Sequence, residues 1–160
     1  MSSPLRLSTD LKEFLKSLSS HDVEFMVAGA HAVAFHGRAR FTEDLDLFLR
    51  RSQLNQKKLA MALEDFGFPI DPAQLEKFFS NPRAMIKLGV KPNLVELLNF
   101  LDGVSFDEAY SRCDRGLIGE TEVGIISLED LLSTKQTVGR PQDLADLAVL
   151  RKIHNLDQAD

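Results

Sequence analysis

The chain has 160 residues, a formal net charge of −5 and 44% hydrophobic residues, which suits one globular domain with a sizeable core. The negative charge argues against a nucleic-acid binder that relies on a broadly basic surface. No apolar run is long enough for a transmembrane helix, and the first ten residues lack the apolar core of a signal peptide. A single cysteine, Cys113, excludes an internal disulfide. We therefore expect a cytoplasmic protein without membrane contact, with one domain over 1–160 whose core spans about 23–150.

Hydrophobic periodicity predicts helices and strands that alternate along the chain. A helix is expected at 9–20, and a short apolar strand at 23–28 leads through Gly29 into a helix at 30–35. The strand at 44–49 alternates strictly, with leucines on one face. The order of elements, with at least one antiparallel strand pair, predicts an α/β (α+β) fold in which helices flank a small mixed β-sheet. The other expected elements are a helix at 53–66, a short helix from Asp71 to Phe79, strands at 84–90 and 94–99, a helix from Ser105 toward Cys113, a strand at 121–126, and helices that begin at Ser127 and at Pro141.

Two aspartates, Asp44 and Asp46, lie on the face of their strand opposite the leucines. Side chains at i and i+2 of a strand project from the same face about 6–7 Å apart. Their carboxylates repel each other unless they are protonated or bridged by a cation. Hard oxygen ligands at this separation suit Mg²⁺, and two such ions can serve an in-line phosphoryl displacement. The simpler interpretation, a solvated sheet face, is favoured for an Asp-x-Asp pattern that stands alone.

The turn formed by Gly29 and Ala30 is a second feature of interest. A strand that ends in glycine and leads into a helix exposes backbone N–H groups, which attract anions, and glycine lets a phosphate approach closely. A tight turn without a ligand is the simpler alternative. Arg38 and Arg40 come just before the aspartates, either to meet phosphate oxygens or as ordinary surface residues.

A later segment of the chain carries both cations and carboxylates. Lys135 lies on the helix that begins at Ser127, and Arg140 lies at the turn that follows. Either residue is placed to approach a triphosphate. We expect Asp143 to pair with Lys135 or Arg140 and to hold the corner between the two helices, and we interpret this aspartate as structural.

These pieces occur in an order that resembles the nucleotidyltransferase superfamily that includes DNA polymerase β. In that superfamily Gly with Gly or Ser precedes an Asp-apolar-Asp pattern at about this spacing. Three blocks further resemble uncharacterised bacterial nucleotidyltransferase-like proteins related to abortive-infection (AbiEii-type) toxins. The resemblance covers most of residues 23–150 and implies the polymerase β-like fold. The three blocks are GAHAVAFHGRARFTEDLDLFL, IKLGVKPNLVELLNFLDGVSFDEA and VGIISLEDLLSTKQTVGRPQDLADL.

The resemblance implies an activity and a set of site residues. The reaction is Mg²⁺-dependent transfer of a nucleoside monophosphate from an NTP, such as ATP, to a hydroxyl group, with one or two metal ions. A third carboxylate is implied on a neighbouring strand, where Glu96 is the candidate because its neighbours Val95 and Leu97 point into the core. The implied catalytic and metal-binding residues are Asp44, Asp46 and Glu96, and the implied nucleotide-binding residues are Gly29, Ala30, Arg40 and Lys135.

Two positions depart from the family pattern. Ala30 replaces the usual Gly or Ser, so a side-chain hydroxyl is missing, and Leu94 stands where related sequences often carry arginine before the third acid. These departures leave open a second hypothesis, a non-catalytic module that acts as a toxin–antitoxin or regulatory partner. The acceptor is also left open among a tRNA end, a protein hydroxyl and a small molecule, and so are an antitoxin or toxin partner and a second copy of the chain.

Overall fold

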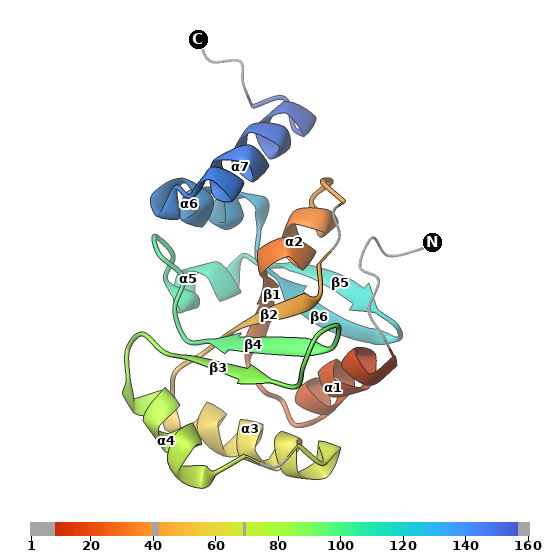
Figure 1. The fold of residues 1–160 in the computed structure, drawn as a ribbon, viewed down its shortest axis with the longest axis vertical. Coiled ribbons are helices and arrows are strands. Elements are labelled where there is room, and N and C mark those ends of the chain that lie inside the picture. Colours follow the sequence, from red (N-terminus) through yellow and green to blue (C-terminus); the bar gives the residue numbers. More distant parts are fainter. Residues whose placement is uncertain (1–8, 40–41, 69, 157–160) are drawn as a thin grey trace.

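The computed structural model describes residues 9–39, 42–68 and 70–156, and its strands form one mixed sheet (Figure 1). The strand order is β3-β4-β2-β1-β6-β5. The central pair β1–β2 is antiparallel, the pairs β2–β4 and β1–β6 on either side of it are parallel, and the outer pairs β3–β4 and β5–β6 are antiparallel. The mixed sheet that the sequence predicts is therefore confirmed. The strands are β1 (Phe25–Ala28), β2 (Asp44–Leu49), β3 (Met85–Leu88), β4 (Leu94–Leu98), β5 (Asp114–Ile118) and β6 (Thr121–Ile125).

Helices lie on both sides of the sheet. Figure 1 shows α1, α3 and α4 together below the sheet and α2, α6 and α7 above it. Local signals define several helix ends: the Ser52 and Ser127 side chains cap α3 and α6, and Gly67 and Gly139 end these helices in the left-handed conformation. The helices are α1 (Thr9–Ser20), α2 (Gly29–Phe35), α3 (Gln53–Phe66), α4 (Pro72–Ser80), α5 (Phe106–Ser111), α6 (Leu128–Val138) and α7 (Pro141–Ile153).

Strand β2 separates the core from the candidate site. Leu45, Leu47 and Leu49 are fully buried, as their alternation predicts. Phe48 is buried on the opposite face, where its ring packs edge-on against Phe106 of α5 with centroids 5.0 Å apart. The first half of that face carries the two aspartates instead and is only partly buried. On the face of β2 opposite the leucines, Phe48 and Phe106 thus cover the C-terminal half of the strand, whereas the N-terminal half carries the two partly buried aspartates.

One strand, β5, is absent from the sequence-based prediction. Its residues are mostly exposed, and only Ile118 is buried. Among the strands of the described ranges it lies at the edge of the sheet, where it pairs with β6. An edge strand with two largely solvated faces shows no alternation of apolar and polar residues, so periodicity does not detect it.

Asn55, which is 1% exposed, ties the start of α3 to the loops beside β1 and β2. Its Oδ1 accepts a hydrogen bond from the Glu24 N–H at 2.8 Å, and its Nδ2 donates to the carbonyls of Glu24 and Arg50 at 3.0 and 2.9 Å. Replacing it with alanine leaves these backbone groups without their partner. We expect Asn55→Ala to lower the free energy of unfolding by about 2–3 kcal/mol in urea denaturation.

The matched control for this prediction is Lys57→Ala, an exposed position on the same helix. Its effect should stay within about 0.5 kcal/mol, because surface substitutions away from special features change stability little. Equal denaturation midpoints for the two variants would contradict the role given to Asn55.

A helix that crosses a bilayer needs about 20 predominantly apolar residues. No helix in the described ranges is both long enough and apolar enough to do so.

Candidate functional site

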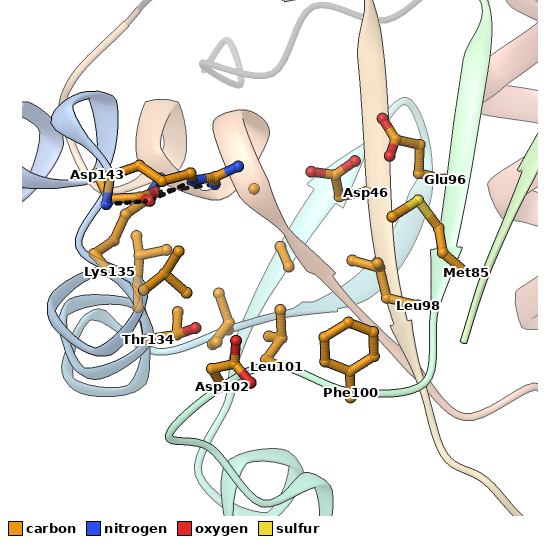
Figure 2. Close-up of a pocket in the computed structure, with 16 residues that line it drawn as sticks. Asp46, Met85, Glu96, Leu98, Phe100, Leu101, Asp102, Thr134, Lys135 and Asp143 are labelled. Carbon is orange, nitrogen blue, oxygen red and sulfur yellow. Dashed lines mark hydrogen bonds and ion pairs between the residues drawn. The ribbon is translucent and has the colours of Figure 1, made fainter. Parts of the chain in front are cut away.

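A cavity of about 280 Å³ opens between the sheet and the corner formed by α6 and α7 (Figure 2). Strands β1 to β4, the turn into α2, and both helices of the corner contribute to its walls. Four of the seven residues that the family resemblance implies for the site line this one cavity, although 106 positions separate the first from the last: Gly29, Asp46, Glu96 and Lys135. Arg140 and Asp143 line it as well.

Strand register places Asp46 and Glu96 side by side. The two residues are Cα partners in the parallel pair β2–β4, and Asp46 is also the partner of Ala28 on β1. Partners on neighbouring strands point to the same face of a sheet, and Figure 2 shows the two carboxylates next to each other. Asp44 lies two residues before Asp46 on the same face but is not among the residues that line the cavity. The three predicted carboxylates therefore form a group at the start of β2 and the middle of β4.

The environment of Asp46 disfavours its charged form. Burial is the main cause and raises the pKa of Asp46 to about 6 from its ordinary 3.8, and the charges of Glu96 and Asp44 add to the shift. Lys135 and Arg140 act in the opposite direction. A raised pKa means that the Asp46 carboxyl group readily takes up a proton, and a bound cation would favour its charged form instead.

Glu96 has a related but more exposed environment. Partial burial raises its pKa first, followed by the charge of Asp44 and a hydrogen bond with that residue. Lys87 and Lys91 lower the pKa of Glu96. Lys87 is the Cα partner of Glu96 across the β3–β4 hairpin, and the sequence analysis missed it. Counting outward from the turn expected at 89–93 pairs position 87 with Val95, one residue short of Glu96, so the sequence did not give this pairing.

The chemistry of this group suits a hard cation. Among the residues that the structure describes, the buried Oδ1 atoms of Asp44 and Asp46 have no hydrogen-bond partner, which costs free energy unless a proton or an ion compensates. Carboxylate oxygens are the ligands that Mg²⁺ prefers. Within the described ranges no three His, Cys, Asp or Glu side chains form a ready-made metal cluster. The fit to Mg²⁺ therefore rests on the donor atoms and on the unpartnered oxygens.

Gly29 provides space beside Asp46. It has φ +62°, and a Cβ at this position would lie 2.1 Å from Asp46 Oδ2. Only glycine fits this approach, because a side chain would need the aspartate to move. Ala30 follows in the first turn of α2 but does not line the cavity. Since α2 has seven residues, the expected contribution of a helix dipole is weak, and the open backbone at Gly29 is what the turn offers.

The corner between α6 and α7 is held by buried ion pairs. Lys135 is 8% exposed, and its Nζ donates to Asp146 at 2.8 Å and to Asp143 at 3.3 Å. Arg140 donates through Nε to Asp143 at 2.7 Å, so Asp143 pairs with both cations that the sequence offered as alternatives. A phosphate group at Lys135 would have to share the ammonium with two carboxylates, whereas the Arg140 side chain is 73% exposed and can reorient.

Of the two arginines that precede β2, the structure describes Arg38 but not Arg40. Arg38 Nη1 donates to the carbonyl of Ala145 at 2.9 Å and lies 3.5 Å from Asp146, so it connects the end of α2 to α7. Arg40, which the family resemblance assigns to nucleotide binding, lies outside the described residues. Its role stays a prediction.

The comparisons with known proteins point to one family. No curated protein matches the chain. A family model with the description "Nucleotidyl transferase of unknown function (DUF2204)" matches residues 7–158, which is nearly the whole chain. The six-stranded mixed sheet flanked by helices is consistent with a nucleotidyltransferase-like fold. The chain therefore belongs to this family of nucleotidyl transferases of unknown function.

Proposed function

We propose that the protein transfers a nucleoside monophosphate from an NTP to a hydroxyl acceptor in a Mg²⁺-dependent reaction at this cavity. One observation carries the proposal. Asp46 and Glu96 are paired across two strands beside the open backbone of Gly29, in a cavity that Lys135 and Arg140 also line. Family membership supports nucleotidyl transfer in general, and the carboxylates support the metal dependence.

Asp44, Asp46 and Glu96 would hold the Mg²⁺. When bound, the ion supplies positive charge that offsets the charge of the phosphate oxygens. In the proposed reaction the acceptor oxygen forms a bond to the α-phosphorus, and the bond from that phosphorus to the β-phosphate oxygen breaks. Pyrophosphate leaves. The acceptor proton passes to the Glu96 carboxylate, whose raised pKa suits a general base.

The remaining residues would position the triphosphate. Gly29 lets phosphate oxygens approach the backbone beside Asp46, and Ala30 can contribute only its N–H group. Arg140 is the more available cation of the corner, because its side chain is exposed while Lys135 is buried between two aspartates. We therefore expect Arg140 to contact phosphate and Lys135 to act mainly through its charge.

One observation favours the alternative, a non-catalytic binding module. Lys135 is already neutralised by Asp143 and Asp146, so the cavity holds less unmatched positive charge than a triphosphate requires. The relation to AbiEii-type toxins, a toxin–antitoxin partner, a bacterial source, the cytoplasmic location, the single domain and a second copy of the chain stay predictions. The same is true of the acceptor, whether RNA, protein or small molecule.

Titration calorimetry of each NTP, in Mg²⁺ and in EDTA, tests the proposal. We expect binding in Mg²⁺ that EDTA removes, and an affinity at least about tenfold weaker in Glu96→Gln, because this variant loses one metal-binding carboxylate. Glu64→Gln, an exposed position on α3, is the matched control and should bind as the wild type does. Absence of binding for every NTP to the wild-type protein would contradict the enzymatic proposal and favour the binding module.

A further inference from the structure

The cavity has two chemically different ends. Asp46 and Glu96 form the charged end, and Leu98, Phe100 and Leu101 line the other. Figure 2 shows Phe100 and Leu101 well separated from the charged residues of the α6–α7 corner and from Asp46. The proposed function assigns the carboxylates and the cations of the corner to a triphosphate and its metal. They leave the apolar end without an assigned ligand.

Strand β4 connects the two ends. Glu96 and Leu98 lie on one face of the strand, about 7 Å apart along it, and Phe100 follows two residues later, just past the end of β4. A nucleotide whose α-phosphate lies at Glu96 would therefore extend its ribose along Leu98 and its base toward Phe100. Leu131 and Val138 of α6 add further apolar side chains to the cavity lining.

The Phe100 ring is held in place by a neighbouring arginine. The guanidinium of Arg83 lies over one side of its ring, 4.0 Å from the centroid, and Nη1 of Arg83 donates to Oδ1 of Asp102 at 2.6 Å. Phe100 lines the cavity whereas Arg83 does not, so Arg83 does not occupy the space in which a base would stack. Bases stack well on such fixed aromatic rings.

Asp102 is the polar group at this end. It lines the cavity beside Leu101, and its ion pair with Arg83 holds it in the charged form, which only accepts hydrogen bonds. The hydrogen bond from Arg83 is also the main reason that the pKa of Asp102 is lowered. A carboxylate accepts a hydrogen bond from the exocyclic amino group of a base, whereas it repels a carbonyl oxygen in the same position.

We propose that the apolar end of the cavity binds the base of the NTP, that Phe100 stacks on it, and that Asp102 selects bases that carry an exocyclic amino group. This inference rests on the proposed function, because it assumes that the charged end binds the triphosphate. It predicts a preference for ATP over ITP and for CTP over UTP.

The chain contains a matched control for Phe100. Arg50 lies over the Phe106 ring at 4.8 Å and is ion-paired with Asp107, which repeats the arrangement of Arg83, Phe100 and Asp102 away from the cavity. We expect Phe100→Leu to weaken Mg²⁺-ATP binding in calorimetry by about 5- to 100-fold, the effect of losing one stacked aromatic ring. Mg²⁺-tripolyphosphate, which has no base, should bind within twofold of its wild-type affinity. Phe106→Leu should change neither affinity.

The second variant, Asp102→Asn, tests base selection at a partly exposed position where folding is not at risk. Its amide can donate to a carbonyl oxygen, so the ATP/ITP and CTP/UTP affinity ratios should fall to about one or below. Asp107→Asn loses the equivalent arginine pairing and should keep the wild-type ratios. The affinity measurements on these four variants do not require the acceptor to be known.

The outcomes separate this inference from the function on which it rests. Equal ATP affinities for Phe100→Leu and Phe106→Leu, or wild-type ratios of one for both nucleotide pairs, would overturn the base subsite while tripolyphosphate binding still supports the charged end. Unchanged NTP affinity with lost transfer in Phe100→Leu would assign this end to the acceptor and also overturn the inference. Failure of both Mg²⁺-ATP and Mg²⁺-tripolyphosphate to bind the wild-type protein would overturn the proposed function itself.

Discussion

Gly29→Ala is expected to lower the free energy of unfolding by about 4 kcal/mol and to abolish Mg²⁺-dependent NTP binding. Two costs add. A left-handed conformation costs an alanine about 1–2 kcal/mol, and φ at this position is +62°. The new Cβ would also lie 2.1 Å from Oδ2 and 2.8 Å from Cγ of Asp46, so overpacking adds a further ~1–3 kcal/mol. Urea denaturation measures the sum, and calorimetry measures the loss of binding.

Gly67→Ala separates the two costs. Gly67 also has a left-handed backbone, with φ +88°, but a Cβ there would have no atom within 4 Å. This variant should lose only the backbone contribution, about 1–2 kcal/mol, and should bind NTP as the wild type does. If Gly29→Ala cost no more than Gly67→Ala and kept NTP affinity, the close approach between Gly29 and Asp46 would have no part in the site.

Asp46→Asn is expected to change stability and activity in opposite directions. The folded state raises the pKa of Asp46 to about 6 from 3.8, so between these values the folded protein binds more protons than the unfolded chain. Stability therefore falls as the pH rises through this window, by up to about 3 kcal/mol above pH 6. Asparagine does not titrate, so the metal-free variant should be more stable than the wild type at pH 8 and should not gain at pH 4.

Activity should respond in the other direction. Loss of a carboxylate that holds the metal is expected to slow nucleotidyl transfer by about a thousandfold. Mg²⁺ should stabilise the wild-type protein against urea at pH 8, because a ligand that binds only the folded state raises its stability, and it should do so much less for Asp46→Asn. The measurements are urea denaturation at pH 4 and pH 8, each in EDTA and in Mg²⁺, with Glu64→Gln as the control. A variant that is less stable than the wild type at pH 8 in EDTA would contradict the electrostatic account of Asp46.

Local sequence patterns were sufficient for most of the secondary structure. The strand at 44–49 and the helix at 53–66 match β2 and α3 residue for residue, because strict alternation, helical spacing of apolar residues and a glycine at the helix end are properties of nearby residues. The edge strand β5 had no such pattern and was missed. The strand predicted at 84–90 is shorter in the structure, where β3 covers Met85–Leu88, because pairing with β4 ends at the turn.

The candidate site depended less on local patterns. The spacing of Asp44 and Asp46 followed from one strand, but their proximity to Glu96 came from a family resemblance, since the parallel β2–β4 register joins residues 50 positions apart. The sequence did not indicate that Phe100 and Asp102 line the same cavity, because they continue the two-residue spacing of Glu96 and Leu98 only beyond the end of β4, where strand alternation no longer fixes a face. The double pairing of Asp143 was foreseen only as two alternatives.

The sequence by itself thus determined the order of the elements except β5, the mixed α/β class, and the face of β2 on which the aspartates lie, since side-chain direction along one strand is local. Only the tertiary structure decided which distant residues share the cavity, that Lys135 is buried between Asp143 and Asp146, and that Gly29 leaves no room for a Cβ beside Asp46. Strand register and helix packing depend on the whole core at once, so no local pattern encodes them.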